Sequence, residues 1–315
     1  MFDDQYEFVV STIDKATNAS IDADLTSQLE TCIVKSNLEH NLRMIDVLMS
    51  TYNGSLFIRE QIESILSQSF SDFRLMIRDD GSQDDTVSII EECALADERI
   101  KVIRDSDGNL GLRRSFMRLL EASTADHFMF ADQDDVWLPD KMSRSFERIS
   151  ELASRYGDDT PILVFTDLAV VDDELAEIDG SLWNYQSLDP EVATDWKKLL
   201  AQNVVTGCTI IANRAAASAS LPFAMPEMMH DHWVAVNTAK FGKIDHLDIQ
   251  TVLYRQHRGN AEGSKNFGLI YALYKIPAII NNRSFYKRSA THFGGVSATG
   301  LMVRKMCLNF GRFYD

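Results

Sequence analysis

The sequence predicts an α/β protein built on a doubly wound, mixed but mostly parallel sheet. Short apolar runs alternate along the chain with stretches of about 10–15 residues in which apolar side chains recur at helical spacing. Of the 315 residues, 45% are hydrophobic and 25% are charged, as in a folded globular chain. Four predicted strands end in polar or acidic clusters, and sheets of this class bind ligands beyond the carboxyl ends of their strands.

The alternation of strands and helices begins after residue 43. Met44–Met49 is the first predicted strand, and Leu56–Gln68 the helix that follows it. The other predicted strands are Phe73–Arg78, Ile100–Arg104, His127–Ala131, Ile162–Thr166 and Ile249–Leu253. The other predicted helices are Asp84–Leu95, Leu112–Ala122, Pro139–Ser154 and one that begins at His230. The loops after the strands are therefore the candidate functional site.

The composition divides the chain into three segments. Residues 1–43 are polar and acidic, and we expect a helical extension that is a candidate for forming a homo-oligomer. Residues 44–264 form the predicted α/β domain. Residues 265–315 hold eight basic residues and one acidic residue together with many aromatic ones, and they predict a second, basic helical extension.

The charge distribution limits the possible partners. The net charge of −16 argues against a nucleic-acid-binding protein, which would carry a basic face. The basic, aromatic segment 265–315 suits an anionic membrane surface, and the alternative is a helical cap that packs on the acidic domain. The four cysteines lie far apart, no signal peptide precedes the domain and no run of 18 residues is apolar. We therefore expect a cytoplasmic protein that can sit at the inner face of the plasma membrane.

The strongest chemical signal is Asp132-Gln133-Asp134-Asp135, directly after an apolar strand. Crowded carboxylates repel one another unless a cation lies among them, and such hard oxygen ligands select Mg²⁺ or Mn²⁺. The alternative is a solvated acidic turn before the helix at Pro139. A phosphatase of the haloacid-dehalogenase type is a rival interpretation of Asp132–Val136, but Ile162 stands where its later acidic motif needs an aspartate.

Two further loops suit a nucleotide. A carboxylate of Asp79 or Asp80, before Gly81 and Ser82, can accept the N3–H of a pyrimidine base on which Tyr52 stacks. The alternative is a simple Asx turn. The loop Asn109–Arg114 enters a helix and suits a diphosphate beside Arg113 or Arg114, although paired surface arginines are also common.

Two histidine-containing segments complete the candidates. In His230-Asp231-His232-Trp233, the carboxylate of Asp231 can act as a general base towards a hydroxyl group. A metal site or a helix cap would use the same residues. His257, after a predicted strand, can bind a metal or a phosphate, or can be purely structural.

Together these segments resemble the inverting family 2 glycosyltransferases of the GT-A fold, in the same order over residues 44–260. Four stretches resemble the bacterial rhamnosyltransferase-like branch, which builds O-antigens and other surface polysaccharides: Ala131–Trp137, the stretch from Asn203 to Thr209, His230–Trp233 and Tyr254–His257. The QxxRW signature of processive synthases is missing, which favours transfer of one or a few sugars.

The resemblance implies a role for each matching residue. Asp231 would be the catalytic base, and the metal ligands would be Asp134, Asp132 and His257. The nucleotide-binding residues would be Thr51, Tyr52, Asn53, Asp79, Asp80, Gly111, Arg114 and Asp132. The acceptor or sugar pocket would contain Asp135, Trp137, Asp167, Gly207, Cys208, His230 and Trp233.

The implied reaction moves a sugar to a hydroxyl of a lipid-linked or growing surface polysaccharide, with Mg²⁺ or Mn²⁺ as cofactor. The first candidate donor is dTDP-L-rhamnose, and a UDP-hexose is the alternative. A GT-A domain without activity that assists assembly of a polysaccharide complex is a third possibility, against which the intact carboxylate set argues.

Overall fold

The computed structural model describes residues 44–257 and 277–311. The predicted extension over 1–43 lies outside the described residues, as do positions 258–276 and 312–315 of the C-terminal part. The strands are β1 Ile45–Thr51, β2 Phe73–Asp79, β3 Ile100–Val102, β4 His127–Ala131, β5 Val136–Trp137, β6 Ile162–Val171, β7 Glu177–Asp179, β8 Ile211–Asn213 and β9 Lys243–Arg255. The helices are α3 Ile58–Leu66, α4 Thr86–Ala96, α5 Leu112–Ala122, α6 Lys141–Tyr156, α7 Leu182–Tyr185, α8 Trp196–Ala201, α9 Arg214–Ser220, α10 His230–Phe241, α12 Arg283–Phe293 and α13 Ala298–Gly311.

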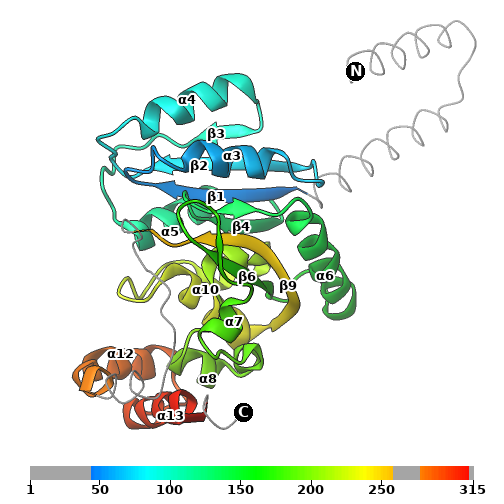
Figure 1. The fold of residues 1–315 in the computed structure, drawn as a ribbon. Coiled ribbons are helices and arrows are strands. Elements are labelled where there is room, and N and C mark those ends of the chain that lie inside the picture. Colours follow the sequence, from blue (N-terminus) through cyan, green and yellow to red (C-terminus); the bar gives the residue numbers. More distant parts are fainter. Residues whose placement is uncertain (1–43, 258–276, 312–315) are drawn as a thin grey trace, which may run out of the picture. The chain divides into compact units, whose positions relative to one another are not determined.

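The strands form one mixed sheet in the order β3-β2-β1-β4-β8-β6-β9-β5, with β7 added beside β6 (Figure 1). β3, β2, β1 and β4 are mutually parallel, and β6 is parallel to β9. β8 lies antiparallel between β4 and β6, and β5 is antiparallel to β9. The prediction of a mixed, doubly wound sheet is confirmed. Its parallel half brings the ends of β1, β2 and β4 to one edge.

Helices cover both faces of the sheet, and β1 shows why. All seven residues of β1 are buried. Ile45, Val47 and Met49 pack in a cluster with α3, α4 and α6, whereas Leu48 packs in a second cluster with α5 and α10. Because successive side chains of a strand point to opposite faces, a continuous apolar strand needs a cover on each side.

Two strands are longer than the sequence predicts. β6 continues past Thr166 through Asp167, and β9 begins at Lys243 rather than at Ile249. Charged residues interrupt the apolar pattern in both extensions, so periodicity alone ends the strands early. The pairing of Ile162 with Lys243 and of Val164 with Asp245 extends both strands in parallel.

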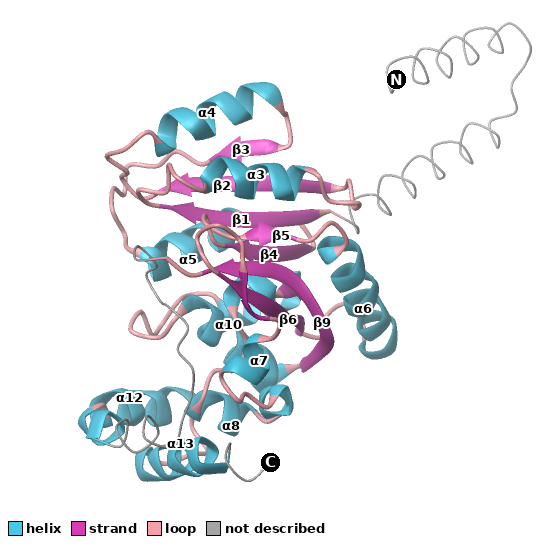
Figure 2. Cartoon of the chain, in the orientation of Figure 1, coloured by secondary structure: helices cyan, strands magenta, loops and turns pink. Residues whose placement is uncertain are grey.

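The helices α12 and α13 lie beside α8 at the end of the described chain (Figure 2). Phe293 and Leu301 are buried and belong to the same core cluster as α5 and α10. The Lys240 Nζ donates to the Phe293 carbonyl at 2.6 Å, and Arg288 pairs with Glu227 at 2.5 Å. Within residues 44–257 and 277–311, no helix has the length and apolar character needed to cross a bilayer.

One buried ion pair joins three parts of the parallel half. Asp46 on β1 lies directly opposite Arg74 on β2, and the two side chains form a two-pronged pair at 2.8 and 2.9 Å. The same carboxylate accepts from the Ser123 hydroxyl at 2.8 Å and from the Ala125 backbone N–H at 3.1 Å, at the entry to β4. Burial opposes ionisation of Asp46, but these hydrogen bonds lower its pKa below 3.8.

We expect Asp46→Asn to lower the free energy of unfolding by about 1.5–3 kcal/mol at pH 7, because it removes the buried charged acceptor, while the Arg74 side chain, which is 34% exposed, can be partly solvated. Urea unfolding followed by circular dichroism measures this. The pKa of Asp46 is lowered in the folded chain, so its contribution is present above about pH 4 and disappears as the pH falls through the folded value. The difference between wild type and variant should therefore shrink in acid.

Glu91→Gln is the matched control, because Glu91 pairs with Arg104 at 2.6 Å while both side chains are exposed. Its effect should stay below about 1 kcal/mol. Equal unfolding free energies for the two variants at pH 7 would contradict the role of Asp46.

Candidate active site

A cavity of about 730 Å³ opens where β1, β2 and β4 end. Segments far apart in the sequence contribute to it, including the first turns of α5 and α10 and the end of β9. The lining residues are Ser50, Thr51, Tyr52, Asp80, Asn109, Gly111, Leu112, Asp132, Gln133, Asp134, Asn203, Thr206, Gly207, Met229, His230, Asp231, His232 and Tyr254.

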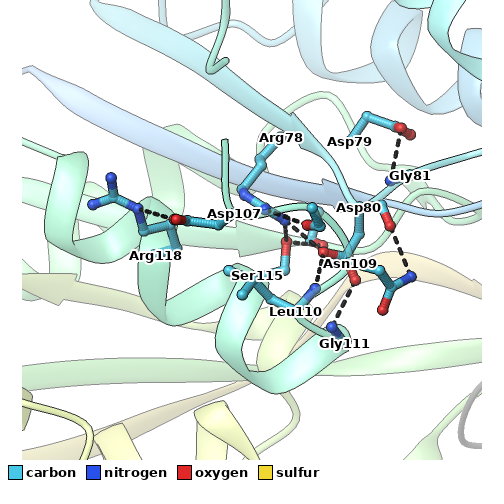
Figure 3. A network of polar contacts seen from close by, with 12 residues as sticks. Arg78, Asp79, Asp80, Gly81, Asp107, Asn109, Leu110, Gly111, Ser115 and Arg118 are labelled. Atoms are coloured by element: carbon cyan, nitrogen blue, oxygen red, sulfur yellow. Dashed lines mark hydrogen bonds and ion pairs between the residues drawn. The ribbon is translucent and has the colours of Figure 1, made fainter. Parts of the chain in front are cut away.

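The two aspartates after β2 have different surroundings (Figure 3). Asp79 turns towards its own loop and accepts from the backbone N–H groups of Gly81 and Ser82 at 3.0 and 2.8 Å. Asp80 lines the cavity, and its two oxygens accept from the N–H groups of Leu110 and Gly111, each at 2.7 Å. Of these two aspartates, therefore, only Asp80 places its carboxylate at the cavity.

A buried arginine supports the Asp80 carboxylate from behind. Arg78 Nη1 donates to Asp80 at 2.6 Å (Figure 3). The Arg78 Nε donates to Asp105 at 2.8 Å. Gly111 directly precedes α5 and has φ +75°, a backbone conformation that favours glycine, and this geometry aims its N–H at Asp80. The carboxylate is held by fixed donors before any ligand arrives.

Tyr52 stands at the cavity with 48% of its surface exposed. The Gln133 side chain holds its backbone: Oε1 accepts from the Tyr52 N–H at 2.9 Å, and Nε2 donates to the Tyr52 carbonyl at 3.1 Å. A Cβ at Gly54 would lie 2.3 Å from Gln133 Oε1, so glycine leaves room for this amide. The sequence prediction assigned no role to Gln133, although it lies inside the acidic motif.

The acidic motif lies next to the end of β9, because β5, which directly follows the motif, pairs with β9. Val136 lies opposite Leu253 and Trp137 opposite Val252. This pairing places His257 beside the motif, and its Nε2 lies 2.8 Å from Asp134 Oδ2. The predicted neighbourhood of Asp134 and His257 is thus present, built from residues more than a hundred positions apart.

The carboxylates of the motif are crowded. Burial and the negative charges of Asp134 and Asp231 raise the pKa of Asp132 to about 7. Burial, with the negative charges of Asp134 and Asp132, also raises the pKa of Asp135 well above its usual value. Asp135 lies below the cavity, where its Oδ1 accepts from the Arg255 N–H at 3.2 Å.

This donor set fits a hard divalent cation. Asp132 and Asp134 present carboxylate oxygens to the cavity, and His257 adds an imidazole nitrogen next to Asp134. A cation placed there would relieve the repulsion that raises the pKa of Asp132. Among the described residues, the three side chains whose ligand atoms lie within 4.8 Å of one another are Asp132, Asp135 and Cys208, and the last two are buried and do not line the cavity.

Asp231 lies in the first turn of α10 and lines the cavity. Its Oδ1 accepts from the His232 N–H at 2.6 Å, and Asn203 Nδ2 donates to its Oδ2 at 3.3 Å. A Cβ at the neighbouring Gly207 would lie 3.2 Å from the His230 Nε2, so glycine leaves room for the imidazole ring beside Asp231. The carboxylate is oriented and open to the cavity.

His230, the neighbour of Asp231, is buried and stacks on Phe116 with ring centroids 4.0 Å apart. Burial, together with the charge of Arg113, lowers the pKa of His230 to about 3. The ring is therefore neutral at physiological pH.

Several predicted site residues lie outside the cavity. Asn53, Asp79 and Arg114 lie in the loops that the sequence predicts for the site. The side chains of Asn53 and Asp79, however, accept hydrogen bonds from backbone N–H groups of the loop after β2, and Arg114 is exposed to solvent. The residues of the predicted acceptor or sugar pocket that are buried in the fold instead are Asp135, Trp137, Asp167, Cys208 and Trp233.

The hydrogen bonds of two of these residues explain their positions. Asp167 accepts from the Ser181 hydroxyl at 2.5 Å and from the Trp183 N–H at 3.2 Å, so it anchors α7. Trp233 donates from Nε1 to the Ser220 carbonyl at 2.6 Å inside the core. A sequence pattern places a residue near a site, but it does not show to which side the residue turns.

Cavity residues that the sequence prediction assigned to no role include Gln133, Asn203, Thr206, Met229 and Tyr254. Asn203 and Tyr254 lie inside segments that resemble the family, and this resemblance was the signal that could have identified them as site residues. Nothing in the local pattern marks Met229.

Comparison with known proteins agrees with this geometry. Residues 46–158 match the model of Glycosyl transferase family 2, and the fold is shared with solved glycosyltransferases of the GT-A type. The chain therefore contains a family 2 glycosyltransferase domain and is a glycosyltransferase. The predicted family resemblance is confirmed, and the match favours a glycosyltransferase over a phosphatase of the haloacid-dehalogenase type.

The chain is 28% identical over 271 residues to the dTDP-rhamnosyl transferase RfbG of Shigella flexneri, covering 81% of this chain and 86% of that relative. It is 26% identical over 172 residues to TuaG of Bacillus subtilis, a putative teichuronic acid biosynthesis glycosyltransferase, covering 54% of this chain and 62% of TuaG.

Two solved structures show the shared fold. S. aureus TarS 1–349 in complex with UDP-GlcNAc matches with a TM-score of 0.55 at 14% identity, over 85% of this chain and 73% of TarS. The mannosyltransferase PcManGT from Pyrobaculum calidifontis, in complex with GDP-Man and Mn²⁺, matches with a TM-score of 0.53 at 15% identity, over 86% of this chain and 71% of that one.

Proposed function

We propose that this glycosyltransferase is inverting and metal-dependent, and that it transfers a sugar from a nucleoside diphosphate sugar to a hydroxyl of a lipid-linked or growing surface polysaccharide. The observation that carries the proposal is that Asp231 shares one cavity with Asp132 and Asp134. The charge of Asp231 contributes to the raised pKa of Asp132, so the two carboxylates interact electrostatically. A base and a metal-binding pair in one cavity are the two parts that a single displacement needs.

The nucleotide base would lie between Tyr52 and Asp80. Tyr52 offers an exposed ring for stacking, and Asp80 offers carboxylate oxygens that can accept the N3–H of a pyrimidine base. Thymine and uracil both carry this N–H, so the pair suits a dTDP or a UDP donor.

The diphosphate would lie beside the acidic motif. Asp132, Asp134 and His257 would hold Mg²⁺ or Mn²⁺, and such an ion would neutralise the charge that develops on the departing nucleoside diphosphate. The chain adds a cation of its own: Arg113 contacts the cavity residue Met229, with its Nε 3.2 Å from Met229 Sδ. A thioether is a weak acceptor, so this guanidinium is available to a phosphate.

Asp231 would start the transfer by accepting the proton of the acceptor hydroxyl. The acceptor oxygen attacks the anomeric carbon as the bond from that carbon to the diphosphate oxygen breaks, and the electron pair of that bond leaves with the nucleoside diphosphate. Attack from the face opposite the leaving group inverts the anomeric configuration. Asn203 and the His232 N–H keep the Asp231 carboxylate oriented for this step.

The relatives suggest a donor. The dTDP-rhamnosyl transferase RfbG aligns with most of this chain, which supports L-rhamnose from dTDP-L-rhamnose. A UDP-hexose is the alternative, and the UDP-GlcNAc complex of TarS shows that the fold accommodates such a donor. We also propose that transfer is not processive.

A lipid-linked acceptor would bring the enzyme to the cytoplasmic face of a membrane. Residues 44–257 contain 37 acidic and 19 basic residues, whereas residues 277–311 contain five basic residues and no acidic one. Arg283 and Lys287 are exposed on α12, and Ile280 next to them is 54% exposed. We propose that this basic face binds anionic lipid.

Asp231→Asn should fold and bind the nucleotide and Mn²⁺ but transfer sugar about 10²–10⁴-fold more slowly, because the amide cannot accept the proton. Product formation by mass spectrometry, with nucleotide binding by calorimetry, measures the two properties. Asp248→Asn removes the same charge from an exposed position on β9 and should retain full turnover. A D231N enzyme with normal turnover would exclude Asp231 as the base.

Thermal shifts with nucleotide sugars, each with and without Mn²⁺, should identify the donor, because a ligand of the native state raises its apparent stability. We expect the largest metal-dependent shift with dTDP-L-rhamnose. A shift only with UDP sugars would exclude rhamnose as the donor sugar.

Arg113→Gln should weaken donor binding about tenfold or more through loss of a charged hydrogen bond, whereas Arg114→Gln should not. Equal donor affinities of the two variants would exclude Arg113 as a phosphate ligand.

Flotation with anionic vesicles tests the membrane contact in the full chain. Each basic residue near an anionic surface contributes about 1 kcal/mol, so R283Q/K287Q should bind phosphatidylglycerol vesicles roughly thirtyfold more weakly. K101Q/K243Q removes two charges from exposed positions of the α/β domain and should float like wild type. Equal flotation of the two variants, or equal binding of wild type to neutral vesicles, would contradict the contact.

A further inference from the structure

Arg255, the last residue of β9, is 2% exposed, and its guanidinium lies directly behind the acidic motif. Its Nε donates to the Asp134 carbonyl at 2.8 Å, its Nη1 to the Asp173 carbonyl at 2.6 Å and its Nη2 to Glu60 at 2.5 Å. The guanidinium also lies over the Phe57 ring, 4.6 Å from its centroid. One side chain therefore joins the acidic motif to α3 and to the loop after β6.

The segment Arg255–His257 contacts the acidic motif in two further ways. The Arg255 backbone N–H donates to Asp135 at 3.2 Å, and His257 lies 2.8 Å from the Asp134 carboxylate. Asp134 is thus bound through its carbonyl on the inner side and through its carboxylate on the side of the cavity. The Phe57 ring contacts both residues of the segment, since its centroid is 4.8 Å from that of His257.

Burying a guanidinium is costly, and Glu60, its carboxylate partner, is half exposed. The arrangement is therefore better explained by the geometry it imposes than by the strength of the ion pair. A guanidinium presents five donors in a fixed plane, spread over three nitrogen atoms, whereas the three donors of an ammonium group all leave one atom and rotate. The crowded carboxylates of the motif need such a restraint, because their repulsion favours moving the loop apart.

We propose that Arg255 is a positioning residue that fixes the Asp134 backbone, so that the carboxylates of Asp132 and Asp134 keep the spacing needed to bind a divalent cation. This inference rests on the proposed metal dependence of the enzyme. It assigns to the residue before Gln256 and His257 a role in metal affinity rather than in the transfer step itself.

The test is Mn²⁺ binding to the full chain, measured by the electron paramagnetic resonance of free Mn²⁺ with and without dTDP. Arg255→Lys retains the charge and loses the planar donors. We expect its Mn²⁺ dissociation constant to rise about 10–100-fold, as for other residues that orient metal ligands. The value of kcat should recover at saturating Mn²⁺, whereas a general loss of structure would lower it at every concentration.

Arg99→Lys is the matched control. Arg99 also pairs with a carboxylate, Asp97, at 2.7 Å, donates to the Leu66 carbonyl at 3.0 Å and lies 4.7 Å from the centroid of Phe73, but it is remote from the cavity. Its Mn²⁺ affinity should equal that of wild type. Phe57→Leu, which keeps most of the apolar volume under the guanidinium, should raise the dissociation constant by roughly threefold, in the same direction as the lysine variant.

The outcomes separate the two proposals. A folded R255K enzyme whose Mn²⁺ dissociation constant lies within twofold of wild type overturns the positioning role while leaving metal dependence intact. If R255K does not fold, an unchanged constant for F57L overturns it instead. A wild-type chain that binds no Mn²⁺ in the presence of dTDP overturns the metal dependence, and the role of Arg255 with it.

Discussion

The structure depends on how it holds four crowded carboxylates, three that line one cavity and Asp135, which is buried beneath it. Asp132, Asp134, Asp135 and Asp231 lie close enough for their charges to act on one another, and burial strengthens the repulsion. The fold compensates on the inner side, where the Arg255 guanidinium donates to the Asp134 carbonyl and the buried Lys141 ammonium interacts with the charge of Asp135. No lysine or arginine lies among the residues that line the cavity within the described chain, although Arg113 contacts the cavity residue Met229. The outer side is thus suited to a ligand that carries positive charge.

The sheet topology brings these groups together. β1, β2 and β4 are parallel, so the loops that carry Tyr52, Asp80 and Asp132 leave the sheet at the same edge. The pairing of the two-residue strand β5 with β9 then brings the segment ending in His257 to the loop. Since β9 itself is held by its long parallel pairing with β6, the position of the acidic motif is coupled to the whole second half of the sheet.

The sequence predicts the elements better than the directions of side chains. Apolar runs locate β1, β2 and β4 within one or two residues, because strands covered on both faces carry continuous apolar patterns. The acidic motif and Asp231 lie in the cavity, since their positions after a strand and at a helix start follow from the same pattern. The choice between Asp79 and Asp80, or between Arg113 and Arg114, depends on how one turn is bonded. The N–H groups of Gly81 and Ser82 hold the Asp79 carboxylate towards its own loop. This orientation results from the geometry of the turn rather than from the residue type.

The neutrality of His230 bears on the base beside it. A charged imidazolium next to Asp231 would stabilise the ionised carboxylate and make it a poorer proton acceptor. Stacking on Phe116 buries the ring, and its pKa of about 3 keeps it uncharged wherever the enzyme works. The groups that bond to Asp231 include the neutral Asn203 amide and the His232 backbone N–H. Neutral donors orient the carboxylate with less cost to its basicity than a cation would impose, and this suits a residue that must take a proton from a hydroxyl group.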